Sequence, residues 1–244
     1  MFPNGGSASA IEYDPPQKKI PDKAEFAEVI EGSTAMSGLF NLYQKGEKLY
    51  MELSPEDFDR EYLFIPTMWS YEVAGNYIPL RVFRFEFNED KIALLWKNIH
   101  YISPGSEYYR RSIENCIPDT VAHVFQIEGK PHPDNNSVLI CLNDCFFSDL
   151  IDFSEALNFS GEASAYSIDR KKALWGKIQA FPENIELEVR YTFNLPKPIN
   201  QVKLPDKRYS TYHVRYSLST LPEDNGYIPR LADDRIGLFF SKIK

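Results

Sequence analysis

Residues 185–220 read IELEVRYTFNLPKPINQVKLPDKRYSTYHVRYSLST. Apolar and polar side chains alternate from Ile185 to Asn194, and the alternation returns from Tyr212 to Ser219. Because successive side chains of a β-strand point to opposite faces, each run predicts a strand with one buried and one solvated face. Prolines cannot donate to a sheet ladder, so the proline-rich residues between the runs predict a connection. The stretch therefore predicts the central pair of an antiparallel sheet.

Strand-like patterns recur through the rest of the chain. The clearest is a hairpin over residues 80–102, in which Phe83, Phe85 and Phe87 share one face and residues 88–91 form the turn. Further strands are predicted at 38–53 (a hairpin), 62–71, 121–127 and 138–142, and short helices at 23–31, 54–57, 107–115 and 169–175. This pattern predicts a mainly β fold, either an antiparallel sandwich or a strongly curved sheet, with a few short helices.

Length and charge limit the possible functions. A chain of 244 residues can bury a large core as one all-β domain or two small ones. Its formal charge of −8 argues against nucleic-acid binding, which needs clustered Lys and Arg, and no apolar run is long enough to predict a membrane span. We expect a leader over residues 1–22, a β-rich domain over 23–221, and a linker or interdomain contact segment over 222–244.

The amino terminus and the cysteines give further expectations. Residues 1–10 are small and polar and do not resemble a secretory signal, so either the protein is cytoplasmic or the sequence begins after a signal or inside a longer reading frame. The odd number of cysteines leaves at least one unpaired. We expect Cys116, Cys141 and Cys145 to be buried or half-buried thiols.

No residue pattern predicts a catalytic or metal centre in this chain. Asp119 with His123, and His132 with Asp134, are isolated pairs, whereas a zinc site needs three or four ligands. The motifs H-E-x-x-H and Gly-x-Ser-x-Gly and a Gly-rich phosphate loop are all missing from the sequence. The sequence therefore predicts no catalytic residue, no bound cofactor and no metal ligand.

Two alternatives remain open at this stage. Trp69, Tyr71 and Tyr77 could form an aromatic platform for a carbohydrate or peptide ligand, although cross-strand aromatic packing is the favoured explanation. Acidic pairs such as Glu56–Asp57 and Glu89–Asp90 could serve glycoside hydrolysis in an independent enzyme, if two acids converge in a cleft.

The carboxy-terminal stretch carries a resemblance to a known family. L-P-E at residues 221–223, followed by P-R-L-x-D-x-R-I-G-x-F at 229–239, resembles the end of the amino-terminal region of bacterial zinc-dependent metalloproteases. Gly38-Leu39-Phe40 resembles the opening hairpin of that region, and Phe181-Pro182-x-Asn184 resembles the entry to its central strands. The resemblance extends over about residues 24–240.

The resemblance implies a non-catalytic module that precedes a peptidase domain carrying H-E-x-x-H-x-x-G-x-x-H. It implies that zinc is bound only by that downstream domain, which would be the partner of this chain, and that the protein is periplasmic or secreted.

The segment 229–240 has two interpretations. Either it folds back onto the sheet, or it contacts the downstream domain; we favour the second narrowly. The expected contact residues are Arg230, Asp234, Arg235, Gly237 and Phe239.

Overall fold

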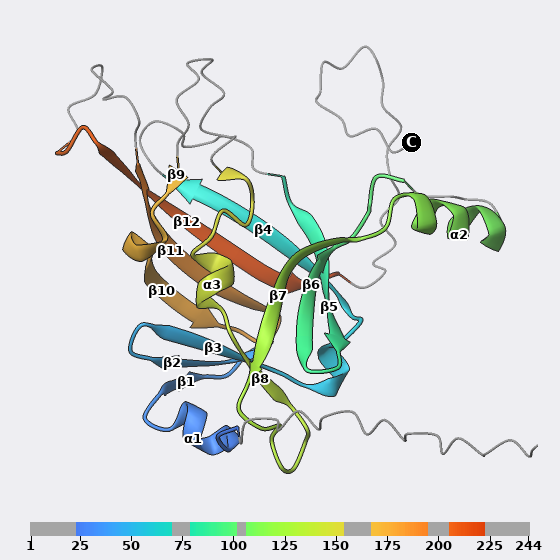
Figure 1. Cartoon of the computed structure of the whole chain (residues 1–244), viewed down its shortest axis with the longest axis horizontal. Coiled ribbons are helices and arrows are strands. Elements are labelled where there is room, and N and C mark those ends of the chain that lie inside the picture. Colours follow the sequence, from blue (N-terminus) through green and yellow to red (C-terminus); the bar gives the residue numbers. More distant parts are fainter. Residues whose placement is uncertain (1–22, 70–78, 102–105, 154–166, 195–204, 223–244) are drawn as a thin grey trace, which may run out of the picture.

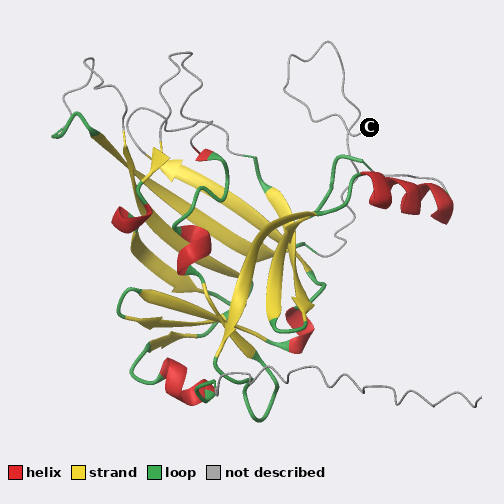
Figure 2. Ribbon diagram, viewed as in Figure 1, coloured by secondary structure: helices red, strands yellow, loops and turns green. Residues whose placement is uncertain are grey.

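The two strands predicted from residues 185–220 form the centre of a large antiparallel sheet (Figure 1). They are β11 (Asn184–Asn194) and β12 (Tyr209–Thr220), which pair along the whole length of β11. The structure is a computed structural model, and it describes residues 23–69, 79–101, 106–153, 167–194 and 205–222. The prediction of a mainly β fold with a few short helices is confirmed (Figure 2).

The described residues form one open sheet of 12 strands, in the order β1-β2-β3-β8-β7-β6-β5-β4-β12-β11-β10, with β9 also paired to β11. Every ladder between these strands is antiparallel. The remaining strands are β1 (Thr34–Met36), β2 (Asn41–Lys45), β3 (Lys48–Leu53), β4 (Glu61–Trp69), β5 (Arg81–Asn88), β6 (Lys91–Trp96), β7 (Thr120–Glu128), β8 (Val138–Cys141), β9 (Ser167–Ile168) and β10 (Leu174–Ala180).

The helices of the described chain are short. They are α1 (Phe26–Ile30), η1 (Pro55–Asp57), α2 (Glu107–Cys116), α3 (Asn143–Phe146) and η3 (Arg170–Lys172). None of the helices in this part of the chain combines the length and apolar character needed to cross a membrane. The helix predicted at 169–175 is wrong in extent, because only η3 is helical there and β10 begins at Leu174. The basic residues 170–172 favoured a helix in the sequence. From Leu174 onward, however, the pairing of β10 with β11 determines the conformation.

The core lies on the concave side of the sheet. On β11 the alternation predicted from sequence places Ile185, Leu187, Val189, Tyr191 and Phe193 in the interior. Helix α3 adds Phe146, whose ring packs 5.2 Å from that of Tyr216 on β12. The hydroxyls of Tyr191 and Tyr216 bond at 2.7 Å, so the polar atoms of these buried rings satisfy each other.

The sheet curls until its two ends approach each other. The backbone N–H of Leu39, between β1 and β2, donates to the carbonyl of Phe181, just after β10, at 2.6 Å. Gly38 permits this approach, because a Cβ at that position would lie 2.6 Å from the backbone N and O of Phe181. The sheet is therefore strongly curved, one of the two forms that the sequence predicted.

The cysteines follow the expectation in two cases of three. Cys145 is buried and Cys141 half-buried, and burial raises the pKa of both thiols. The expectation is wrong for Cys116, which is exposed on α2. No residue of α2 is buried, so this helix offers no interior in which a thiol could be covered.

A buried carboxylate ties together β2, β3 and the loop before β8. Glu52 is only 9% exposed, and it accepts hydrogen bonds from the hydroxyls of Ser137 and Tyr43 and from Nδ2 of Asn41. Burial acts to raise the pKa of Glu52, but these hydrogen bonds outweigh it, so the pKa lies below its usual value.

We predict that Val189→Asp lowers the free energy of unfolding by about 3–5 kcal/mol, because it buries an unpaired charge between β10 and β12. Urea denaturation measures the change. Arg190→Gln, at the next and exposed position, serves as the control and should change stability by less than about 0.5 kcal/mol. Equal effects at both positions would contradict the register described here.

We predict that Glu52→Gln lowers stability at pH 7 by about 1–3 kcal/mol, because charge-assisted bonds to a buried carboxylate are lost. A pKa that is depressed on folding stabilises the fold above the unfolded-state pKa, about 4.3. That contribution disappears as the pH falls through the folded-state pKa, so the difference between wild type and variant should shrink in acid. Denaturation curves from pH 7 to pH 3 test this, with the exposed Glu47→Gln as control. A difference independent of pH would show that the charge of Glu52 contributes nothing.

Candidate functional site

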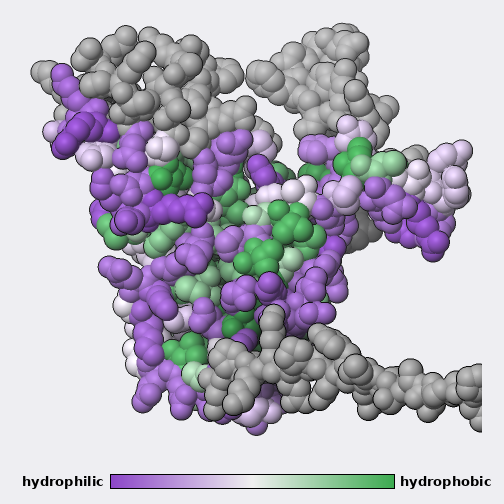
Figure 3. All heavy atoms as spheres, viewed as in Figure 1, coloured by the Kyte–Doolittle hydropathy of each residue, from purple (hydrophilic) through white to green (hydrophobic). Residues whose placement is uncertain are grey.

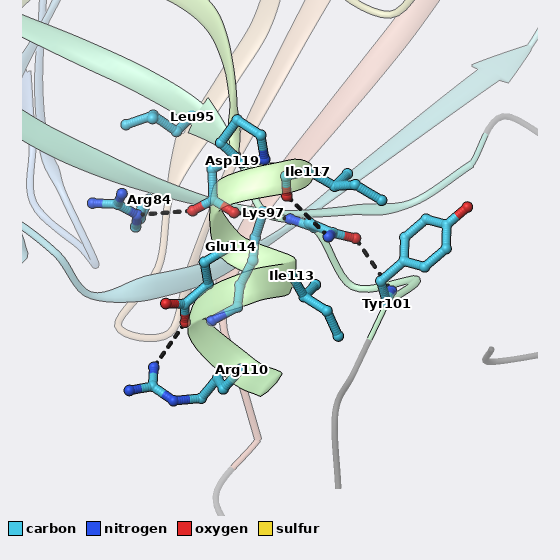
Figure 4. A pocket seen from close by; sticks show the side chains of 11 residues that line it. Arg84, Leu95, Lys97, Tyr101, Arg110, Ile113, Glu114, Ile117 and Asp119 are labelled. Atoms are coloured by element: carbon cyan, nitrogen blue, oxygen red, sulfur yellow. Dashed lines mark hydrogen bonds and ion pairs between the residues drawn. The ribbon is translucent and has the colours of Figure 1, made fainter. Parts of the chain in front are cut away.

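A cavity of about 600 Å³ opens between α2 and the neighbouring ends of β5 and β6 (Figure 4). Both polar and apolar side chains line it. The lining residues are Arg84, Leu95, Lys97, Asn98, Tyr101, Arg110, Ile113, Glu114, Ile117, Pro118 and Asp119.

Asn98 and Asp119 hold the base of the cavity together, where β6 has ended and β7 is about to begin. The backbone N–H of Asn98 donates to Oδ1 of Asp119 at 3.0 Å, and its Nδ2 donates to the carbonyl of Ile117 at 3.2 Å. Its Oδ1 accepts from the backbone N–H groups of His100 and Tyr101 at 3.1 and 3.3 Å. These bonds fix the two connecting segments to each other.

Arg84 on β5 lies beside this base and is fully engaged by carboxylates. Its Nε donates to Asp119 at 3.2 Å, and its Nη atoms contact Asp59 at 2.7 Å and Glu86 at 3.0 Å. Partial burial acts to lower the pKa of Arg84, but the bonds to Asp119 and Glu86 outweigh it and raise the pKa. Arg84 therefore connects β5 to the base of the cavity. Its Nε and both Nη atoms already contact carboxylates, so it is poorly placed to bind an anionic ligand.

Helix α2 forms the outer wall of the cavity and projects from the body of the protein (Figure 1). Arg110 bridges Glu107 at 2.6 Å and Glu114 at 2.7 Å along the helix surface. Ile113 and Ile117 face the cavity beside Tyr101 (Figure 4). A helix of ten residues that buries none of them is only marginally stable in water, so its packing here is incomplete.

Exposed apolar side chains occur on α2 and, separately, on β7. Tyr108 and Tyr109 on α2 are 78% and 63% exposed, and Val121 and Val124 on β7 are 56% and 45% exposed. Apolar side chains gather over β7 on the face shown in Figure 3. The apolar pattern of residues 121–127 is typical of a buried strand, but β7 turns only one face to the core. We call these four residues the α2–β7 surface.

The site residues expected from sequence alone lie mostly outside the described part of the chain. Tyr71 and Tyr77 fall there, and Trp69 is described only as the last residue of β4. The expected contact residues of the carboxy-terminal segment also fall there: Arg230, Asp234, Arg235, Gly237 and Phe239.

The members of the two weighed metal-ligand pairs make other contacts in the structure. Asp119 bonds to Arg84 and Asn98, while His123 packs its ring 4.6 Å from that of Phe125. His132 packs against Phe26, and its Nδ1 accepts a hydrogen bond from the backbone N–H of Asp134 at 3.2 Å, so its contact with Asp134 is through the backbone and not the carboxylate. Within the described ranges, no three His, Cys, Asp or Glu side chains form a group that could hold a metal.

The acidic pair Glu56–Asp57 has a structural role. Asp57 accepts from the backbone N–H of Ser54 at 2.8 Å and from the hydroxyl of Tyr62 at 2.9 Å. Its two oxygens therefore cap η1 and anchor β4.

Sequence reasoning missed the cavity. Its residues come from three separate segments, and Asp119 was considered only as a partner of His123. One local signal was available: Asn98, which follows the end of β6 by two residues, is a residue type that often closes a turn by bonding to the backbone two residues on.

Two family models match the chain. One is described as "Domain of unknown function (DUF5117)" and matches residues 75–244, and the other as "Domain of unknown function (DUF5118)" and matches residues 23–68. No curated protein and no solved structure matches the chain. The boundary between the two matches falls between β4 and β5, which pair directly from Glu61↔Arg84 to Phe64↔Arg81. The two matched segments therefore contribute neighbouring strands to one sheet.

We predict that Asp119→Ala loosens the cavity base and lowers stability by about 1–3 kcal/mol, because Arg84 and the N–H of Asn98 lose an acceptor. Amide hydrogen exchange should accelerate at residues 97–101 and stay unchanged in β11. Asp90→Ala, in the exposed β5–β6 turn, is the control. Unchanged exchange at 97–101 would mean that Asp119 does not hold this segment.

Proposed function

We propose that this chain, which belongs to the family described as domain of unknown function (DUF5117), is a non-catalytic module of a zinc-dependent metalloprotease. In this proposal it packs against the peptidase domain that follows in the same polypeptide, and so positions or shields that domain. The zinc would be held by the H-E-x-x-H motif of the peptidase domain, and residues of the present chain would make no contact with it.

The observation that carries the proposal is the α2–β7 surface. It comprises two groups of exposed apolar side chains, one on α2 and one on β7, and exposed apolar surface of this kind is typical of a region that another protein or domain covers. Tyrosines are well suited to such contacts, because they offer a large rigid apolar ring together with one polar atom. The sequence resemblance supplies the identity of the partner, and the exposed surface supplies the place where it could pack.

The contacts within the site also favour a binding module over an independent enzyme. Arg84, Lys97 and Arg110 are all paired with carboxylates. Asp57 and Asp119 accept hydrogen bonds from neighbouring structural groups. Groups used in this way stabilise the fold and are poorly placed to exchange protons with a substrate.

We predict that amides of α2 and of residues 121–124 exchange about tenfold more slowly in a protein extended through the peptidase domain than in the 244-residue chain. The peptidase domain would cover these residues. Strand β10, on the opposite side of the sheet order, is the internal control and should exchange equally in both proteins.

A pair of variants in the extended protein sharpens this test. Val124→Lys should restore fast exchange by placing a charge in the contact, whereas Gln126→Lys, an exposed polar position on the same strand, should not. Equal exchange of α2 and β7 in the short and extended proteins would exclude packing through this surface. An extended reading frame without H-E-x-x-H would exclude the metalloprotease.

A further inference from the structure

We propose that a second cavity, beside the one described above, binds a small monocarboxylic acid with an apolar body, and that Arg81 holds its carboxylate. The volume of this cavity is about 470 Å³, within the range of about 300–1,000 Å³ that is typical of pockets for small ligands. It extends from Arg81 and Trp96, at the neighbouring ends of β5 and β6, to five residues that also line the first cavity: Lys97, Asn98, Tyr101, Ile117 and Pro118. The inference uses neither the α2–β7 surface nor a peptidase domain, so it stands or falls apart from the proposed function.

Arg81 supplies a positive charge that no carboxylate neutralises within the described chain. Of the two Lys and Arg side chains in the lining, Lys97 is paired with Glu61, and no acid is among the described residues that line the cavity. The guanidinium of Arg81 lies over the ring of Trp96, with Cζ 5.1 Å from the ring centre. No hydrogen bond or ion pair joins this guanidinium to another described residue. Its N–H donors are therefore available to a ligand, in contrast to those of Arg84 in the first cavity.

The contact with Trp96 prepares Arg81 to bind a carboxylate. A guanidinium presents a planar fork of N–H donors that matches the two oxygens of a carboxylate. Packing against an indole ring restricts the orientation of that plane, so less conformational entropy is lost when a ligand binds. Trp96 is itself held by other rings, since its ring centre lies 5.0 Å from that of Phe64 and 6.4 Å from that of Phe83.

The rest of the lining favours an apolar ligand body. Six residues contribute apolar surface to the cavity: Pro79, Leu80, Ile99, Tyr101, Ile117 and Pro118. Three of them, Leu80, Tyr101 and Ile117, are large side chains that are 40–46% exposed. Exposed apolar side chains that line one cavity form a surface that an apolar group can cover, and covering them removes this area from water.

The charge of the site matches a carboxylate better than a phosphate. A phosphate monoester carries about −1.5 to −2 charges at pH 7 and three strong acceptor oxygens, and one guanidinium in an apolar lining would leave part of that charge unpaired. A carboxylate carries a single charge, and one guanidinium satisfies both of its oxygens. The ligand class is therefore an aromatic or branched aliphatic carboxylic acid, either free or at the carboxyl end of a peptide.

The test is an NMR titration of the full 244-residue chain with N-acetylphenylalanine and with its amide. The two probes share one apolar body, and only the first carries a carboxylate. We expect the acid to bind at least about tenfold more tightly than the amide, because only the acid forms the charge-assisted pair with Arg81. The indole N–H signal of Trp96 and the amide signals of residues 97–101 should shift with the acid.

Two further probes distinguish the sources of the carboxylate. Tighter binding of the peptide N-acetyl-Gly-Gly-Phe than of 3-phenylpropionate would support the proposal and assign the site to the ends of polypeptides. Tighter binding of 3-phenylpropionate would support it and assign the site to free acids.

Variants separate the role of Arg81 from that of the fold. Arg81→Gln should weaken binding of the acid at least about tenfold and leave binding of the amide unchanged. Arg60→Gln is the matched control, because Arg60 also lies over an aromatic ring, with Cζ 5.6 Å from the ring centre of Tyr62, but does not line the cavity. Leu80→Glu leaves Arg81 in place and should weaken binding of the acid by repulsion, with Leu80→Gln as its neutral control. The NMR spectrum of each variant also reports whether the fold is intact.

Four outcomes would overturn the proposal. The acid and the amide could bind with equal affinity, or Arg81→Gln could bind the acid as tightly as the wild-type chain does. Shifts that map to other strands, and leave Trp96 and residues 97–101 unchanged, would place the ligand elsewhere. Finally, none of the acids could give saturable shifts at concentrations up to about 10 mM, which would mean that the cavity has no useful affinity for this class of ligand.

Discussion

The structure depends on one constraint: in the described chain, a 12-stranded sheet must cover its own apolar face with few helical residues to help. A sheet with one apolar face needs a second layer. Here curvature provides that layer, because the strands on either side of β4 turn their inner faces toward each other. The four residues of α3 complete the interior by packing Phe146 against Phe64 and Tyr216, whose rings also contact each other. The curvature of the sheet is therefore what allows the core to pack.

The parts of the fold that follow from neighbouring residues could be predicted from sequence. Residues close in sequence determine the alternation on β11 and β12, the turn after β5, and the start of η1 at Ser54–Pro55. The pairing of β3 with β8 and of β4 with β12 could not be predicted, because alternation identifies the buried face of a strand and not its partner. The cavity was missed for the same reason, since ladder pairing brings its residues together across long sequence separations.

Two family models match separate segments of the chain, but these segments form a single sheet. Residues 23–68 provide β1 to β3 and most of β4, and residues 75–244 provide the rest. Yet β4 lies between β5 and β12, and β3 pairs with β8, so each segment completes ladders of the other. Tyr62 and Phe64, from the first segment, are buried among residues of the second. The two matched segments therefore share one core in this chain.

The two ends of the sheet meet where Gly38 and Leu39 contact Phe181, and this contact bears on self-association. An open sheet ends in two strands with unpaired backbone groups, and such edges recruit strands from other molecules into fibrils. Here β1 is only three residues long, and β10 carries an irregularity between Trp175 and Ile178. Where the two ends meet, the Leu39–Phe181 bond uses backbone groups that another chain could otherwise engage. A side chain at position 38 would clash with the backbone of Phe181, so the close contact between the two ends of the sheet requires glycine there.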